Sequence, residues 1–306
     1  MDDLDLNYAG INLKWACNNN LTNNTANANA NAGIHLDVDS NSNVLAHNTA
    51  TDNNRTGILL TTSSNNRLTD NTASNNAAEW DSKGIVLEKG SNSNTLRNNV
   101  ANTNSEYGIY LNSSSNNTLS NNTLNLNAFG AEWGAGISLM DSSNNTLFNN
   151  TASGNNGAGI TLYESFNNTI VHNNASYNDQ GLFLELNSSN NTITSNNLSD
   201  NTDCGICFYS SANDNLLYLN NFMNNTVNVN PSSSTNLWNS SEPLHYEYNG
   251  SDFTSYLGNY WDDYAFEGND TNGDGVGDTP YPIDSGADNY PLMVPWENYD
   301  ILGVVC

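Results

Sequence analysis

The stretch SSNNTLFNNTASGN, residues 142–155, decides the fold. Its Asn pairs flank Leu147, although Asn is a poor helix former and is depleted in ordinary strands. The stretch is one copy of a repeat that begins with glycine and two apolar residues spaced by two. The glycines are Gly10, Gly33, Gly57, Gly84, Gly108, Gly136, Gly159, Gly181 and Gly205. A period of 22 to 28 residues indicates a solenoid.

Three apolar columns follow the glycines. Ile or Leu comes directly after each glycine, and Leu or Phe comes two residues later, as in Ile137 and Leu139. Spacing of two predicts a strand with one buried face. The third column is Leu21, Leu45, Leu68, Leu96, Leu119, Leu147, Ile170, Ile193 and Leu217.

Asn occupies two positions around the third column in every repeat. The first set is Asn19, Asn43, Asn66, Asn94, Asn117, Asn145, Asn168, Asn191 and Asn215; the second is Asn24, Asn48, Asn71, Asn99, Asn122, Asn150, Asn173, Asn196 and Asn220. Stacked parallel strands place equivalent residues ~4.8 Å apart, where Asn side chains can form a ladder. Asn also tolerates the left-handed backbone of a sharp corner, so we expect one residue to serve both purposes. The sequence predicts an all-β, right-handed parallel β-helix solenoid of about nine rungs.

The period ends at Pro231, where aromatic residues become dense. A solenoid needs its terminal strand edges covered. We therefore predict β-helix repeats in residues 1–230 and an irregular, aromatic-rich C-terminal cap in residues 231–306.

The repeat GI-x-L-x-x-SSNNTL-x-x-NTAS-x-N resembles the right-handed β-helix of pectate-lyase-like and NosD-like proteins, most closely that of archaeal cell-surface proteins. Residues 257–293, LGNYWDDYAFEGNDTNGDGVGDTPYPIDSGADNYPLM, resemble the end of that family's module. Together the two segments cover nearly the whole chain. The resemblance implies an extracellular, cell-surface setting, but no single activity, because the fold hosts lyases, hydrolases, adhesins and scaffolds.

An acidic loop in the cap has the spacing of an EF-hand-type calcium loop. The ligands would be Asp270, Asn272, Asp274, the backbone carbonyl of Val276, and Asp278. Tyr281 stands where such loops have a bidentate Glu, and Asp284 or Asp288 could complete the shell. The loop predicts calcium as the cofactor; the alternative is an acidic, Gly-rich turn.

The net charge of the chain limits the kinds of partner that it can bind. The chain has 6 Lys and Arg against 32 Asp and Glu, a net charge of -26. Such a chain repels nucleic acid and anionic lipid, and no run is long and apolar enough to insert into a membrane. No basic residue follows Arg97, so most of the solenoid lacks the strong base of a pectate-lyase-like mechanism. Scattered His residues argue against the copper site that a NosD-like resemblance implies.

Three acidic–aromatic pairs precede the glycines of successive rungs: Glu79 with Trp80, Glu106 with Tyr107, and Glu132 with Trp133. Stacked rungs would align them as a stripe suited to a carbohydrate or a protein partner. The alternative is that each loop buries its aromatic residue locally. We predict no catalytic residue.

Sequons are abundant, and the glycosylation candidates are Asn20, Asn54, Asn112, Asn187, Asn224, Asn239, Asn249 and Asn269. The disulfide candidates are Cys17, Cys204, Cys207 and Cys306. Cys17, in the first rung, lies too far from the ninth to bond there within one chain. Cys204 and Cys207 could pair with each other if the chain bends at Gly205, or one could pair with Cys306. Leftover thiols would be free, or Cys17 would meet a cysteine of the next subunit.

These features favour a non-enzymatic extracellular structural protein, a calcium-bound subunit of a surface layer, sheath or fibre. We expect end-to-end self-association, with glycans or cell-envelope proteins as further partners. The alternative is a β-helix polysaccharide lyase or hydrolase, or a carbohydrate-binding protein that acts through the Glu/Trp stripe.

Overall fold

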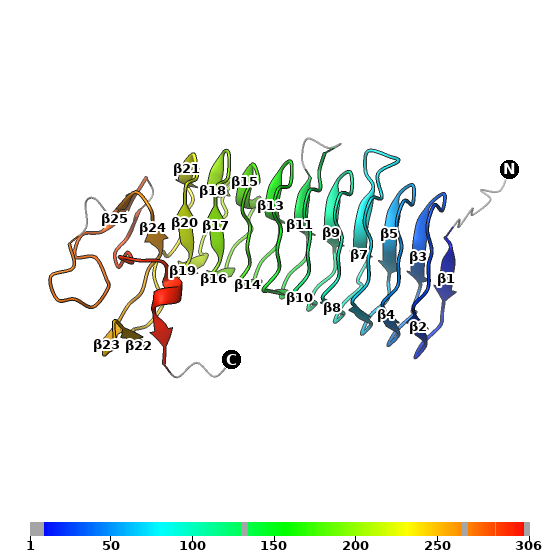
Figure 1. The fold of residues 1–306 in the computed structure, drawn as a ribbon, viewed down its shortest axis with the longest axis horizontal. Helices are drawn as coiled ribbons and strands as arrows, with labels where there is room; N and C mark the ends of the chain where they lie inside the picture. The colour runs from blue at the N-terminus through cyan, green and yellow to red at the C-terminus, as the bar shows by residue number, and fades with distance from the viewer. Residues whose placement is uncertain (1–8, 130–133, 265–268, 285, 303–306) are drawn as a thin grey trace.

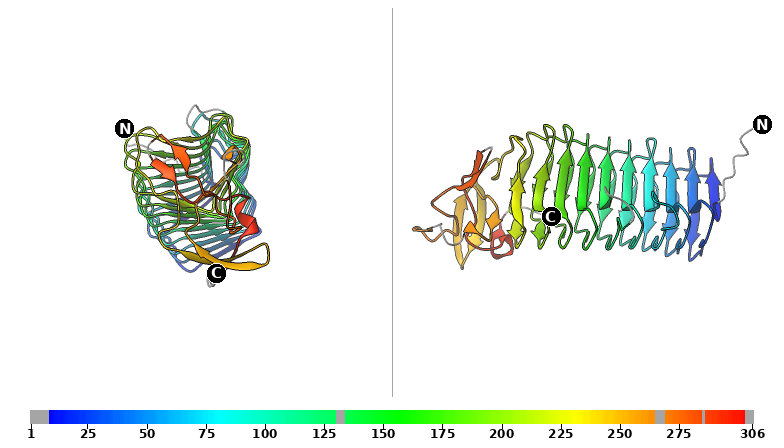
Figure 2. Two further views of the ribbon diagram at one scale, coloured as in Figure 1. Left: turned by 90° about the vertical axis from the view of Figure 1, so that its left-hand side faces the viewer. Right: turned by 90° about the horizontal axis from the view of Figure 1, so that it is seen from above.

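The computed structural model describes residues 9–129, 134–264, 269–284 and 286–302. The repeats coil into a solenoid whose rungs stack along one axis, with the cap beyond the last rung (Figure 1). The end-on view shows successive rungs nearly superimposed (Figure 2). The predicted all-β, right-handed parallel β-helix is confirmed.

Three parallel sheets form the walls of the solenoid. The ten-stranded sheet contains β1 (Ile11–Lys14), β3 (Ala32–Asp37), β5 (Thr56–Thr61), β7 (Lys83–Glu88), β9 (Tyr107–Asn112), β11 (Ala135–Met140), β13 (Ala158–Tyr163), β15 (Gln180–Glu185), β18 (Cys204–Phe208) and β21 (Val227–Asn230). The nine-stranded sheet contains β2 (Asn20–Thr22), β4 (Val44–Ala46), β6 (Arg67–Thr69), β8 (Thr95–Arg97), β10 (Thr118–Ser120), β12 (Thr146–Phe148), β14 (Thr169–Val171), β16 (Thr192–Thr194) and β19 (Leu216–Tyr218). The third contains β17 (Asn197–Ser199), β20 (Asn221–Met223) and β24 (Tyr260–Trp261).

The apolar columns fill the interior. Ile137, Leu139 and Leu147 are fully buried and pair in register with the equivalent residues of neighbouring rungs. The repeat glycines face the same interior, where a Cβ on Gly136 would lie 2.7 Å from that of Ala152. Only glycine therefore fits where the two walls approach.

Asn ladders run along the solenoid. The Oδ1 atom of Asn145 accepts the backbone N–H and the Nδ2 of Asn117, at 2.8 and 3.2 Å. Both predicted sets form such ladders, and a third set was not predicted: Asn29, Asn53, Asn76, Asn104, Asn127, Asn155, Asn178, Asn201 and Asn225. The ladders satisfy backbone donors that the corners leave without a strand partner.

The expectation that one Asn makes both the ladder and the corner is wrong. The left-handed residues precede the ladder positions: Asn144 has φ 56° before Asn145, and Asn149 has φ 52° before Asn150. The backbone N–H and the side chain of the ladder residue both point along the solenoid axis to the next rung. The preceding residue therefore adopts the left-handed conformation that turns the chain.

The cap closes the C-terminal end. Trp261 is buried between the rings of Phe222 and Tyr281, each with a centroid 4.3 Å away. Two ladders continue past Pro231, because Asn215 donates to Asn236 and Asn220 donates to Asn259. The cap therefore adds a partial rung.

The remaining elements lie in the cap. They are β22 (Leu244–Tyr248), β23 (Ser251–Ser255) and β27 (Asp300–Ile301) in one antiparallel sheet, β25 (Tyr281–Ile283) paired with β26 (Gly286–Asp288), and the 3-10 helix η2 (Trp296–Asn298). In the described part of the chain, no helix is long and apolar enough to cross a membrane.

Candidate functional site

The outer face of the ten-stranded sheet carries a row of aromatic and polar side chains beside a cavity. Residues between the two buried columns of each strand point outward, because successive side chains alternate. This outward column is His35, Leu59, Val86, Tyr110, Ser138, Thr161, Phe183 and Cys207. Beside it runs a second column, Asp37, Thr61, Glu88, Asn112, Met140, Tyr163 and Glu185.

Polar contacts link the N-terminal rungs of this face. Lys14 Nζ lies 3.1 Å from Asp37 Oδ2, and His35 Nε2 lies 3.1 Å from Thr61 Oγ1. Thr61 in turn donates to Glu88 Oε1 at 3.2 Å. Burial lowers the pKa of His35, so its imidazole is neutral at pH 7.

Two stacked tyrosines occupy the middle of the face. The rings of Tyr107 and Tyr110 lie 4.9 Å apart with an interplanar angle of 9°. Lys83 Nζ lies 5.6 Å from the centroid of Tyr110 and 2.5 Å from Glu106 Oε2. Burial, reinforced by the charge of Glu106, raises the pKa of Tyr110 to about 12 and that of Tyr107 further. Both hydroxyls therefore stay protonated at neutral pH.

A cavity of about 320 Å³ adjoins the tyrosine stack. Its lining includes Tyr107, Ser138, Met140, Tyr163, Phe183 and Glu185. Burial raises the pKa of Glu185 above its ordinary value. This volume, with aromatic walls and a few polar groups, is typical of a small-ligand site.

The predicted acidic–aromatic stripe is divided in the structure. Glu106 and Tyr107 lie on the face just described, whereas Glu79 and Trp80 line a separate hollow of about 250 Å³. Trp80 is 86% exposed, and Glu79 pairs with Arg55 at 3.4 Å. Glu132 and Trp133 lie outside the described residues. A binding role for the stripe stays a prediction.

The outward column was missed from the sequence. Its residues occupy the variable position of the G-I-x-L motif, so they share no residue type. The only available signal was the aromatic and polar character of this position from Tyr110 onward.

The predicted calcium loop is folded by its own carboxylates. Asp270 accepts the backbone N–H groups of Gly273, Asp274 and Gly275 at 2.7, 3.1 and 2.8 Å. Asp278 accepts that of Thr271 at 2.9 Å. Calcium binding through Asp270, Asn272, Asp274, Val276 and Asp278 stays a prediction.

The suggestion that Asp288 completes the calcium shell stays a prediction, and its carboxylate is already hydrogen-bonded within the cap. Its side chain is fully buried in the cap, where Oδ2 accepts the backbone N–H of Asn259 at 2.7 Å and Trp261 Nε1 at 3.0 Å. Tyr290 donates its backbone N–H to Oδ1 at 3.0 Å. Asp288 therefore joins parts of the cap.

Of the pairings left open for the cysteines, the structure forms Cys204–Cys207, with Cα atoms 6.0 Å apart. Gly205 lies within strand β18, and the strand register omits it as it omits the equivalent glycines of other rungs, such as Gly181. Cys17 is exposed and free, and Cys306 lies outside the described residues.

One glycosylation candidate is contradicted. Asn239 is buried at 7% exposure, and its Nδ2 donates to the carbonyl of Ser240 at 2.9 Å. A glycan needs an accessible amide, so this sequon is unsuitable. The other candidates are exposed or half-buried.

Two family models match the chain. Residues 126–266 match the family described as periplasmic copper-binding protein (NosD), and residues 4–124 match the right handed beta helix region. No curated protein matches at a significant level.

Several solved structures share the fold. The periplasmic alginate epimerase AlgG is 20% identical, with a TM-score of 0.50 over 65% of this chain and 47% of that one. The A-module of the Azotobacter vinelandii mannuronan C-5 epimerase AlgE6 is 16% identical, with a TM-score of 0.52 over 71% and 57%. The Dettilon tailspike protein is 19% identical, with a TM-score of 0.55 over 65% and 42%. The chain thus spans about half the length of these proteins, and such identities show the fold alone.

Proposed function

We propose that this chain, a right-handed parallel β-helix repeat protein, binds a neutral glycan along the outer face of its ten-stranded sheet. The observation that carries the proposal is the stack of Tyr107 on Tyr110 beside the 320 Å³ cavity. A sugar ring presents apolar C–H faces and polar hydroxyl edges. Aromatic rings can pack against the C–H faces, and the hydroxyl, amide and carboxylate groups beside them can hydrogen-bond to the sugar hydroxyls.

The charge of this face favours a neutral ligand. The lysines of this face are already paired with carboxylates, Lys14 with Asp37, Lys83 with Glu106 and Lys89 with Glu88, and Glu185 adds a further carboxylate beside the cavity. A polyanion would meet uncompensated negative charge on a chain of net charge -26. The solved epimerases are named for alginate and mannuronan; the acidic face here favours a different class of sugar.

Tyr110 and Lys83 are poorly suited to act as catalytic bases. A raised pKa keeps Tyr110 protonated at neutral pH, and Glu106 holds the ammonium group of Lys83. Neither side chain is therefore ready to act as a base.

We place this activity outside the cytoplasm. The Cys204–Cys207 disulfide supports an oxidising compartment. The NosD family is described as periplasmic, and so is the alginate epimerase AlgG.

The proposal is tested by affinity electrophoresis and calorimetry with neutral mannans and glucans, with alginate as the anionic comparison. Tyr110→Ala should weaken binding at least about ten-fold, as expected for loss of an aromatic anchor. Phe148→Ala removes an exposed aromatic ring from the nine-stranded sheet and is the matched control. Equal binding by the two variants, or binding of alginate alone, would contradict the proposal.

A second candidate is the structural subunit expected from the sequence. It is favoured by β1, an edge strand of the ten-stranded sheet in the described residues; at the other edge, Asn228 of β21 is hydrogen-bonded to Asp262 and Asp263 of the cap. An edge strand offers unpaired backbone groups to another chain. Light scattering across a wide concentration range, with and without calcium, tests this candidate; a monomer throughout would count against it.

A further inference from the structure

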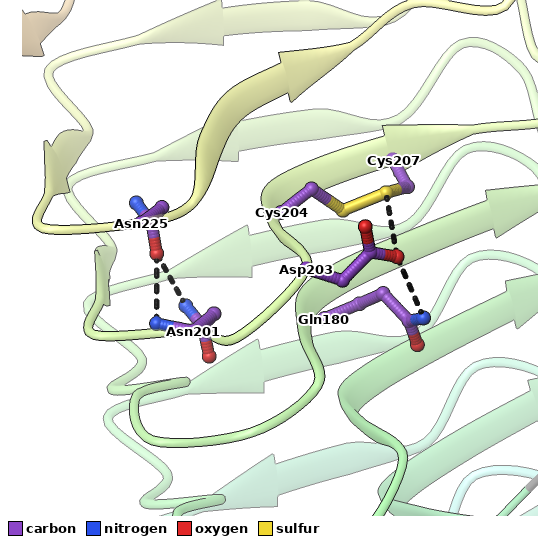
Figure 3. The surroundings of a disulfide bond; sticks show 6 residues. All are labelled: Gln180, Asn201, Asp203, Cys204, Cys207 and Asn225. Atoms are coloured by element: carbon purple, nitrogen blue, oxygen red, sulfur yellow. Dashed lines mark hydrogen bonds between the residues drawn. A yellow bond between two sulfur atoms is a disulfide. The ribbon is translucent and has the colours of Figure 1, made fainter.

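The Cys204–Cys207 disulfide lies on the ten-stranded sheet with the carboxylate of Asp203 beside it (Figure 3). Asp203 Oδ2 lies 3.9 Å from Cys207 Sγ and accepts a hydrogen bond from Gln180 Nε2 at 3.1 Å. Both cysteines are buried, whereas Asp203 is exposed. An exposed carboxylate therefore lies next to a buried disulfide.

The side chains of Asp203, Cys204 and Cys207 lie as close together as the ligands of a metal ion. The two sulfur atoms and one carboxylate oxygen all lie within 4.8 Å of one another. Across residues 9–302, apart from the undescribed gaps, this is the one such group of three His, Cys, Asp or Glu residues. Two cysteines separated by two residues have the spacing of zinc ligands.

We propose that reduction of this disulfide creates a site for a borderline-soft divalent cation such as Zn²⁺. A dithiol reductant supplies two electrons and two protons, the S–S bond breaks, and the reductant becomes a disulfide. Zn²⁺ then binds Cys204, Cys207 and Asp203 as the two thiols lose their protons, and water takes the fourth position. The oxidised protein has no thiolate to offer, so the site exists in one redox state only.

The backbone holds this arrangement without the S–S bond. Strand β18 is paired with β15 on one side and β21 on the other, and the register fixes Cys204 opposite Gln180 and Val227. The backbone N–H of Asp203 donates to Asp179 at 2.8 Å. To the left of the cluster in Figure 3, Asn201 donates through Nδ2 to Asn225 at 2.9 Å. The ligands therefore stay adjacent after reduction.

The site is tested in a chain carrying Cys17→Ser and Cys306→Ser, which removes the other thiols. The protein is reduced with a dithiol, freed of reductant, and titrated with Zn²⁺ or Cd²⁺ under anaerobic conditions in excess Ca²⁺. Excess Ca²⁺ fills oxygen-only sites, because hard cations prefer oxygen. Equilibrium dialysis, Cd²⁺–thiolate absorption and proton release are the readouts.

We expect one ion per reduced chain and no thiolate-bound ion in the oxidised chain. Asp203→Asn should weaken binding about ten-fold or more, whereas the matched Asp214→Asn change on an exposed turn should not. Joint substitution Cys204→Ser and Cys207→Ser should abolish the absorption. Absence of binding after reduction, equal affinity in the Asp203 and Asp214 variants, or loss of the β-sheet circular dichroism on reduction would overturn the proposal.

Discussion

Replacing Asn145 by Ala tests whether the ladders order the corners. Asn145 is 1% exposed in the first ladder, and its Oδ1 accepts both the backbone N–H and Nδ2 of Asn117. Its own Nδ2 donates to Asn168 Oδ1 at 3.2 Å. Ala removes all three hydrogen bonds, whereas Asn168 Oδ1 keeps the backbone N–H of residue 145.

The cost follows from these contacts. The buried backbone N–H of Asn117 loses its acceptor, at about 1–3 kcal/mol. The two lost amide–amide bonds add about 0.5–1.5 kcal/mol each, although Asn117 Nδ2 retains a second acceptor in Ser115. The total loss of unfolding free energy should be about 2–6 kcal/mol.

The assay combines urea unfolding with hydrogen exchange at the Asn117 amide. Thr146→Ala, one residue away on the outer side of β12, is the control and should cost less than about 1 kcal/mol. The Asn145 variant should show faster exchange at Asn117 than the control does. Equal losses of stability, or unchanged exchange at Asn117, would refute the role of the ladder.

Three further results are expected. If calcium binds the acidic loop, chelation should accelerate hydrogen exchange in residues 257–293 before the solenoid, whereas uniform acceleration would argue against a local site. Burial raises the pKa of Asp288 from 3.8 to about 6, so the native state holds this proton more tightly than the unfolded state does. The unfolding free energy, measured by urea unfolding, should therefore fall by about 3 kcal/mol as pH rises from about 4 to 6. The Asp288→Asn variant should lack this decrease. Equal slopes of unfolding free energy against pH in the variant and the wild type would contradict the prediction. Joint substitution of Cys204 and Cys207 by Ser opens a four-residue covalent loop and should cost about 2 kcal/mol in the same assay, with a loss above about 4 kcal/mol counting against loop closure as the main effect.

The register of the solenoid could be predicted because each position recurs in every rung. Ile137, Leu139 and Leu147 have equivalents throughout the chain, so one correct alignment places the whole core. Two ladders followed from the same alignment. The third ladder could have been found as well, because its positions follow those of the second by five residues, just as those of the second follow the first. Asn145, Asn150 and Asn155 show this spacing.

The candidate site could not be predicted in the same way. Tyr110, Ser138 and Phe183 occupy equivalent outward positions, but core packing does not constrain their type. Ser138 and Phe183 line the cavity together with side chains of the neighbouring column, such as Met140 and Tyr163. Asn236 and Asn259 likewise continue the ladders through a chain path with no period.

The most direct test of glycan binding is a hydrogen-exchange footprint with a saturating neutral oligosaccharide. We predict slower exchange in β9, β11, β13 and β15, around Tyr110 and the adjoining cavity, and no change in the nine-stranded sheet. Exchange unchanged on the ten-stranded sheet, or slowed only on the nine-stranded sheet, would contradict the account.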